Sequence, residues 1–149
     1  MKTLTEKEQR RKDYLKEYNK KYRALYAKEL DKKCWESRKR RSQSDINVAF
    51  RLILTVAKTR SNKINREFGI DLEYVNLLWS RQKGICKLSG LPMSRGVGTK
   101  NKVSIDRINS NKGYVKGNCQ LVTWEVNQAK ASLTQSEFIK MSKAVAKNN

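Results

Sequence analysis

Asp106 and Asn127 are the residues whose types and positions fit a chemical function best. Asp106 lies in a run from Val103 to Ile108 that mixes apolar and polar residues. Asn127 lies in a stretch with a helical pattern that begins after Trp124. A carboxylate and an amide carbonyl, with water and phosphate in the other positions, are ligands that Mg²⁺ accepts. If the two side chains converge, they predict a magnesium site.

A strand, a loop, a second strand and a helix must bring these two residues together. The run 103–108 has the pattern of a strand, and Leu121 to Trp124 has the composition of another. Turn-forming residues lie between them: Asn109, Ser110, Asn111, Gly113, Gly117 and Asn118. Two antiparallel strands with a helix across them place Asp106 and Asn127 near one point. On spacing alone, the plainer interpretation is that both residues only cap and turn the chain.

The runs SIDRI, KGYVKGN and VNQAK, in this order, resemble the ββα-metal (HNH) nuclease motif. The likeness is to the small phage-type HNH proteins that carry Asp-Arg where most members carry Asp-His, and it covers residues 46 to 145. It implies an α+β fold in which a ββα-metal unit at about residues 103–131 is surrounded by helices. A long basic helical leader precedes that unit.

The resemblance also implies a role for each matching residue. Asp106 and Asn127 are the expected metal ligands, Asn118 is expected to fix the loop of the hairpin, and Lys130 is expected to add positive charge near the developing anion. Arg107 stands where the family has its water-activating histidine, and the chain contains no histidine. A guanidinium stays protonated in proteins, so Arg107 is expected to clamp a phosphate oxygen and not to act as a base.

The function that these residues predict is a DNA endonuclease or nickase that depends on Mg²⁺, with Mn²⁺ as a substitute. The first alternative is a non-catalytic DNA-binding accessory protein that reuses the HNH fold, which the missing histidine favours. The retained Asp106 opposes it, because a carboxylate that faces phosphate adds repulsion to a site that only binds. A third alternative is a basic RNA-binding protein, although no standard RNA-binding module is present.

The charge of the chain predicts a polyanionic partner, most plainly double-stranded DNA. Its 149 residues carry 34 Lys and Arg against 14 Asp and Glu, a formal charge of +20. Cationic side chains that contact phosphates release counterions and supply most non-specific affinity for nucleic acid. The expected DNA-contacting residues are Arg38, Lys39, Arg40, Arg41, Arg95, Lys100, Lys102, Lys112 and Lys116. Residues 94–102 are expected to form a mobile loop, either an ordinary surface loop or a flap over the site.

The chain is expected to have two parts, a basic helical leader at 1–44 and an HNH-like nuclease domain at 45–149. In the leader, Tyr14, Tyr18, Tyr22 and Tyr26 recur at every fourth residue and form one stripe. This stripe is expected to pack on the body or on a second copy in a homodimer, or to meet nucleic acid. A disordered arm that orders on DNA is the alternative, and Ser42 to Ser44 are the expected linker.

Three expected helices complete the domain, with starts marked by Asp45, Asp71 and the pair Thr134 and Glu137. The last of them is expected to close the core. The basic face of the first, which includes Arg60 and Lys63, is expected to be solvent-exposed surface.

The cysteines, Cys34, Cys86 and Cys119, are too scattered for a disulfide framework. Many relatives of the motif hold a structural zinc with two Cys-x-x-Cys pairs. In this chain those positions are Cys86, Ser89, Thr123 and Val126, so the sequence predicts no structural zinc. No apolar run is long enough to cross a bilayer and no signal peptide is recognisable, so the expected location is the cytoplasm, of a bacterial host if the protein is phage-encoded.

Overall fold

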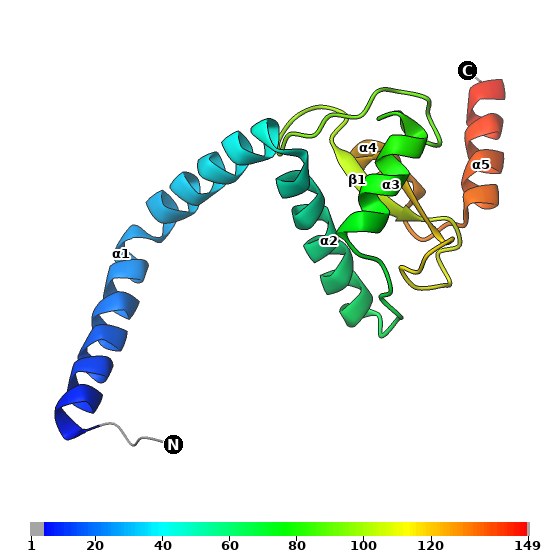
Figure 1. Ribbon diagram of the computed structural model, residues 1–149. Coiled ribbons are helices and arrows are strands. Elements are labelled where there is room, and N and C mark those ends of the chain that lie inside the picture. Colours follow the sequence, from blue (N-terminus) through cyan, green and yellow to red (C-terminus); the bar gives the residue numbers. More distant parts are fainter. Residues whose placement is uncertain (1–4, 149) are drawn as a thin grey trace. The chain divides into compact units, whose positions relative to one another are not determined.

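The computed structural model describes residues 5–148, which fall into two compact units divided between Arg38 and Lys39. Helix α1 (Glu6–Ser44) makes up the described part of the first unit and continues into the second (Figure 1). The second unit then contains, in chain order, α2 (Ile46–Lys63), α3 (Leu72–Gln82), β1 (Val103–Arg107), β2 (Cys119–Thr123), α4 (Trp124–Lys130) and α5 (Gln135–Lys147).

Helix α1 is long and polar, and none of residues 5–38 is buried. Its side chains interact along the helix: Glu17 with Lys21 at 3.1 Å and Glu29 with Lys33 at 2.7 Å. The rings of Tyr14, Tyr18, Tyr22 and Tyr26 lie in one row, with successive ring centroids 6.4, 6.2 and 4.7 Å apart. The expected tyrosine stripe therefore exists, and its rings contact one another on an exposed helix face. Among the described helices, neither this one nor any other is apolar over a stretch that would cross a bilayer.

The two strands pair antiparallel, with Ile105 opposite Leu121 and Asp106 opposite Gln120. Helix α4 follows β2 without a loop, because Thr123 ends the strand and caps the helix by accepting a hydrogen bond from the backbone N–H of Val126. This confirms the α+β fold with a hairpin followed directly by a helix.

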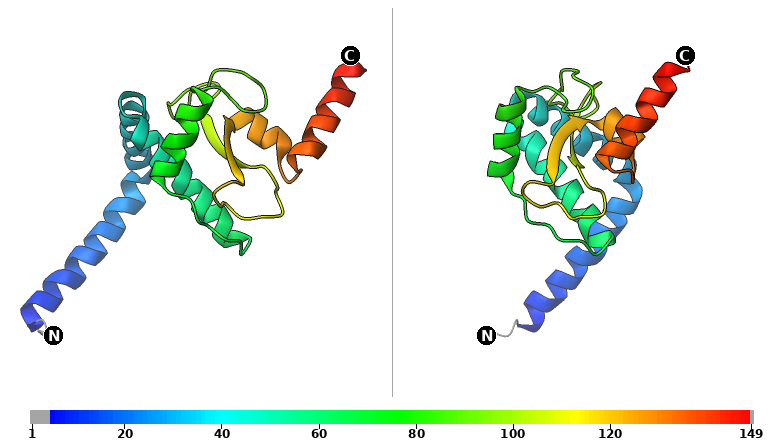
Figure 2. Two further views of the ribbon diagram at one scale, coloured as in Figure 1. Left: turned by 45° about the vertical axis from the view of Figure 1, so that its right-hand side comes forward. Right: turned by 90° about the vertical axis from the view of Figure 1, so that its right-hand side faces the viewer.

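Helices α2 and α3 lie on one side of the hairpin and α4 on the other (Figure 2). Successive side chains of a strand point to opposite faces, so one face of the hairpin is directed toward α2 and α3 and the other toward α4. Val103, Ile105 and Leu121 belong to the apolar core together with Phe50 and Val75 of α2 and α3. Asp45 and Asp71 cap α2 and α3, as the sequence predicted.

The segment that joins α2 to α3 is bonded to the loop of the hairpin. Tyr114 donates its backbone N–H to Glu67 O at 2.9 Å, and Gly69 donates to Tyr114 O at 2.8 Å. Gly113 lies so close to Glu67 that a Cβ there would be 2.1 Å from the Glu67 carbonyl oxygen. The buried hydroxyl of Ser61 bonds to Arg66 O at 2.6 Å, which fixes the start of the same segment. The end of α2 is therefore attached to the hairpin loop.

The last turn of α1 belongs to the second unit. Ser42, expected in a linker, is the buried residue of α1 and accepts a hydrogen bond from the Val97 N–H at 3.1 Å. Only Asp45 separates α1 from α2. The loop 94–102, expected to be mobile, is held by this bond and by the bonds of Ser94 to Asn101 and Val103.

Helix α5 begins with the predicted capping box of Thr134 and Glu137, but it does not close the core. None of its residues is buried, and Ile139, Met141 and Val145 are exposed. An amphipathic pattern shows that a helix has an apolar face but not what that face packs against, so the sequence-based expectation was wrong here.

Gly113→Ala should destabilise the second unit by about 2 kcal/mol or more, because the new Cβ would overlap the backbone of Glu67 and force the two segments apart. Urea unfolding followed by circular dichroism measures the change. Gly69→Ala is the matched control on the facing segment, since its Cβ would meet only ordinary contacts at 3.7 and 3.8 Å. Equal stability of the two variants would contradict the close approach.

Candidate active site

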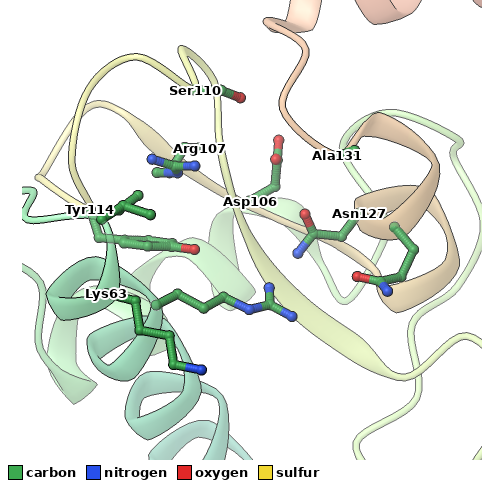
Figure 3. A pocket seen from close by; sticks show the side chains of 10 residues that line it. Lys63, Asp106, Arg107, Ser110, Tyr114, Asn127 and Ala131 are labelled. Carbon is green, nitrogen blue, oxygen red and sulfur yellow. The ribbon is translucent and has the colours of Figure 1, made fainter.

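A cavity of about 310 Å³ lies at the end of β1, between α2 and α4. Its lining residues come from α2, β1, the hairpin loop and α4: Arg60, Lys63, Ile64, Asp106, Arg107, Ser110, Tyr114, Asn127, Gln128 and Ala131. Figure 3 shows Asp106 and Asn127 on one side of this cavity and Arg107, Tyr114 and Lys63 on the other. The structure thus brings Asp106, Arg107 and Asn127 of the predicted site together.

The amide of Asn127 has a defined orientation. Its Nδ2 donates to the Ile105 carbonyl oxygen at 3.1 Å and to Ser104 Oγ at 2.7 Å. A carbonyl oxygen only accepts hydrogen bonds, so the nitrogen must face Ile105 and the amide oxygen must face away from it. That oxygen points toward the carboxylate of Asp106 (Figure 3).

Asp106 is buried, and each of its oxygens accepts one hydrogen bond. Lys130 Nζ lies 3.0 Å from Oδ1, and Gln120 Nε2 lies 2.9 Å from Oδ2. A carboxylate offers about four acceptor positions, so both oxygens keep a lone pair for a further contact. Gln120 and Lys130 thus fix the carboxylate at the wall of the cavity without saturating it.

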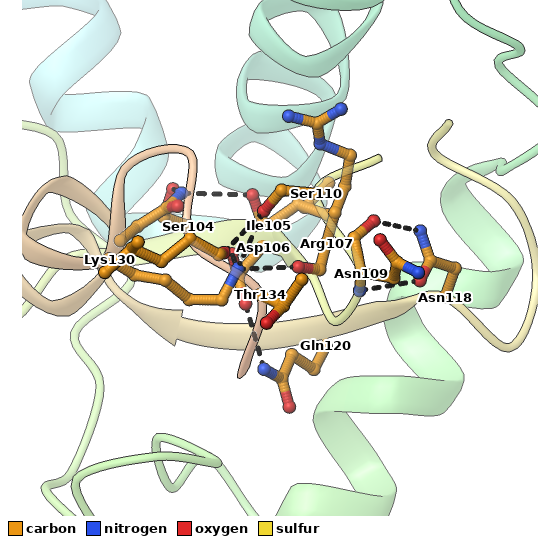
Figure 4. A network of polar contacts seen from close by, with 12 residues as sticks. Ser104, Ile105, Asp106, Arg107, Asn109, Ser110, Asn118, Gln120, Lys130 and Thr134 are labelled. Atoms are coloured by element: carbon orange, nitrogen blue, oxygen red, sulfur yellow. Dashed lines mark hydrogen bonds and ion pairs between the residues drawn. The ribbon is translucent and has the colours of Figure 1, made fainter. Parts of the chain in front are cut away.

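Lys130 lies behind Asp106 and does not line the cavity. Its side chain is completely buried, and its ammonium donates to three acceptors: Asp106 Oδ1, Arg107 O at 2.8 Å and Ser110 Oγ at 3.2 Å (Figure 4). An ammonium has three N–H donors, so none is left for a substrate. Lys130 therefore acts on the site through Asp106, whose charge it balances.

Arg107 is held at the opposite wall. Its Nη1 donates to Lys112 O at 3.1 Å, and its guanidinium lies 5.2 Å from the centre of the Tyr114 ring. The side chain is only partly buried. A guanidinium has five N–H donors, so most of them remain available to an anion in the cavity.

Arg60 and Lys63 are exposed, as the sequence predicted, but they also line the cavity, which the sequence did not predict. Both belong to the last turn of α2. The connection of residues 67–69 to residues 113–114 brings that turn to the end of β1. Gly113 was the signal for this close approach, although its partner Glu67 is not evident from local sequence.

Asn118 is buried and makes three hydrogen bonds across the hairpin loop. Its Oδ1 accepts from the Asn109 N–H at 2.9 Å, and its Nδ2 donates to Asn109 O and Gly113 O (Figure 4). It does not line the cavity. Asn118 therefore holds the loop that carries Tyr114 and supports the backbone that follows Arg107.

The remaining cationic residues predicted to bind DNA lie outside the cavity. Lys112 and Lys116 are in the hairpin loop, and Lys116 lies 3.7 Å from Asp71 on the surface. Lys102 lies over the ring of Trp124 at 4.5 Å, in the same loop region as Arg95 and Lys100. Arg38, Lys39, Arg40 and Arg41 are in the last turns of α1.

Cys86, Ser89 and Thr123, three of the four positions compared above with a zinc site, are joined by hydrogen bonds, and Thr123 is bonded in turn to the fourth, Val126. Cys86 Sγ accepts from the backbone N–H of Ser89 at 3.5 Å and of Thr123 at 3.4 Å, and Thr123 Oγ1 accepts from the Val126 N–H. Burial acts to raise the pKa of the Cys86 thiol, but its hydrogen bonds with Ser89 and Thr123 lower the pKa by more. Hydrogen bonds of Cys86 thus link the segment that contains Cys86 and Ser89 to the junction of β2 and α4.

A second buried thiol lies close to the candidate site. Burial, together with the nearby Asp106 carboxylate, raises the pKa of Cys119 to about 12. Cys119 pairs with Arg107 across the hairpin. Its thiol therefore stays protonated at neutral pH and is a poor nucleophile.

The side chains at the cavity fit a magnesium ion in their chemistry. Asp106 presents a carboxylate with free lone pairs and Asn127 an amide oxygen, both of the hard type that Mg²⁺ prefers. Between residues 5 and 148, no three His, Cys, Asp or Glu side chains cluster as a metal cage would require. Mg²⁺ usually keeps several waters and binds through one or two protein oxygens plus phosphate, so two ligands suffice.

The hairpin, the helix that follows it and the helices around them form an HNH-like fold. The structure resembles that of the rare-cutting HNH restriction endonuclease PacI, with a TM-score of 0.51, over 66% of this chain and 78% of that chain. Sequence identity is 17%, so the likeness shows the fold alone. No family model and no curated protein matches the sequence.

Lys130→Met should cost about 3–5 kcal/mol of the free energy of unfolding, because it leaves the Asp106 carboxylate buried without its cation. Urea unfolding measures the loss. The double variant Asp106→Asn with Lys130→Met removes both charges and should recover much of that stability. A loss below about 1 kcal/mol in Lys130→Met would show that Asp106 does not depend on Lys130.

Proposed function

We propose that this chain is a Mg²⁺-dependent DNA endonuclease or nickase that hydrolyses phosphodiester bonds at the cavity beside Asp106. The observation that carries the proposal is the orientation of Asn127, whose amide oxygen points toward the Asp106 carboxylate and not into the core. Two oxygen ligands on one wall and a guanidinium on the other suit a metal ion and a phosphate together. The likeness to an HNH endonuclease fold supports the same reading.

Each side chain at the cavity has a distinct task in this proposal. Asp106 and Asn127 hold the metal, and Arg107 binds a non-bridging oxygen of the scissile phosphate and offsets charge that develops on it. When bound, Mg²⁺ polarises the phosphate and stabilises the departing 3′ oxygen. Lys130 is a positioning residue, because it orients Asp106 without reaching the cavity.

Arg107 cannot remove a proton from the attacking water, because a guanidinium donates hydrogen bonds and does not act as a base in proteins. Its contribution is electrostatic. The cavity therefore lacks the imidazole that the HNH motif normally supplies, and a slow enzyme is expected.

A non-catalytic DNA-binding protein is the second candidate, and the Asp106–Lys130 pair is the observation that favours it. Lys130 already balances the charge of Asp106 within the protein. The cavity therefore attracts anions through Arg60, Lys63 and Arg107 without a metal. Binding alone would explain these cations but leaves the aligned oxygens of Asp106 and Asn127 without a purpose.

Nicking of supercoiled plasmid tests the proposal. Wild type should relax the plasmid with Mg²⁺ or Mn²⁺ and not with EDTA, and Asp106→Asn and Asn127→Ala should each slow nicking by about 100-fold or more. Asp106→Asn is chosen because its amide oxygen can still accept the hydrogen bond of Lys130, which an alanine cannot. Glu125→Gln, an exposed acidic residue of α4, is the matched control and should keep wild-type activity. A wild type that binds DNA but never nicks it would favour the non-catalytic candidate.

Arg107→His should raise the nicking rate, because an imidazole at this position could accept the proton of the attacking water. The rate of this variant should climb as the pH rises through about 6.5, the ordinary pKa of histidine, since only the neutral ring is a base. Wild type should lack that step. Comparing the pH profiles of the variant and wild type at saturating Mg²⁺ measures it, and identical profiles would mean that residue 107 does not face the attacking water.

A further inference from the structure

Arg60 and Lys63 form the wall of the cavity that faces Asp106 from α2. They are three residues apart in one helix, so they share a face. Neither makes an ion pair with any residue that the structure describes. Two cations at a cavity wall without an acidic partner are a site for anions.

The end of α2 is held rigidly at this place. Ser61, which lies between the two cations in the chain, is fully buried. Its hydroxyl is a donor 2.6 Å from Arg66 O and 3.1 Å from Glu67 O, both in the segment that follows α2. Glu67 in turn accepts the backbone N–H of Tyr114, whose ring also lines the cavity. The two cations are therefore presented by a fixed backbone, which reduces the entropy lost on binding.

The third cation of the cavity, Arg107, comes from β1 and not from α2. Its guanidinium is anchored by Lys112 O and by the ring of Tyr114. Because Lys130 balances Asp106, the cavity keeps three positive charges, and one phosphodiester carries only one negative charge. The charge balance favours more than one phosphate.

We infer that Arg60 and Lys63 bind the phosphate next to the one that Arg107 holds, so that the cavity takes two successive phosphates of one nucleic-acid strand. This inference rests on the proposed function, because it takes the Arg107 phosphate as the scissile one. It makes α2 a DNA-contacting element of the second unit. Residues 39–149 carry 21 Lys and Arg against 7 Asp and Glu, which is +14 of the formal charge of +20.

A purely structural role for the same residues is the competing explanation. The carbonyl end of a helix carries partial negative charge, and Arg60 and Lys63 lie there. In that role their removal would lower the stability of the fold. Their removal would then change the salt dependence of DNA binding no more than the removal of two cations elsewhere on the surface.

The experiment compares two double variants of the full chain that lose the same charge from the same helix. Arg60→Gln with Lys63→Gln removes the cations of the cavity, and Arg51→Gln with Lys58→Gln removes exposed cations that do not line it. Binding of a short fluorescent duplex is measured by anisotropy in EDTA over a series of salt concentrations, so that no cleavage occurs. Urea unfolding of both variants is measured alongside.

For the cavity variant, the slope of the logarithm of the binding constant against the logarithm of the salt concentration should fall in magnitude by about 1 for each phosphate contact that is lost. For the control the slope should change clearly less. Equal slopes in the two variants, or a loss of stability with an unchanged slope, would overturn the inference. If the cavity variant shows the expected loss but wild type never nicks plasmid, the nuclease proposal fails while α2 remains a phosphate-binding element. If wild type nicks and the slopes are equal, only the inference fails.

Discussion

The buried ion pair of Asp106 and Lys130 is the interaction on which the candidate site depends. One ammonium joins β1 and the hairpin loop to α4, since it donates to Asp106 and Arg107 O of β1 and to Ser110 of the loop. Buried charges are costly unless they are paired and hydrogen-bonded. This pair meets that condition, and it leaves the carboxylate at the cavity wall with a fixed direction. The pair thereby orients one of the two proposed metal ligands, while Ile105 O and Ser104 Oγ orient the other, Asn127.

Much of the fold could be predicted from local sequence. The change from strand pattern to helical pattern at Trp124 located the hairpin and α4, and Asp45, Asp71 and Thr134 marked helix starts, because caps and periodicity depend on neighbouring residues. The convergence of Asp106 and Asn127 was also predicted, since the hairpin and α4 are contiguous in the chain.

The features that were missed depend on contacts between distant segments. Lysine is almost never fully buried, so nothing in the sequence indicated that Lys130 lies behind Asp106. Arg60 and Lys63 resemble any solvated helix face until residues 67–69 pair with the hairpin loop. The apolar residues of α5 have the periodicity of a core helix, yet none of them is buried, and Ile139, Met141 and Val145 are exposed.

The close approach of Gly113 to Glu67 also offers a way to sort distant sequences. A chain with a similar hairpin but a larger residue at this position has no room for the connecting segment against its loop. The helix that corresponds to α2 would then lie elsewhere in such a chain, and its site would lack the wall that α2 forms here. The presence of glycine just before the loop tyrosine is thus a one-letter marker for a two-walled cavity, readable without a structure.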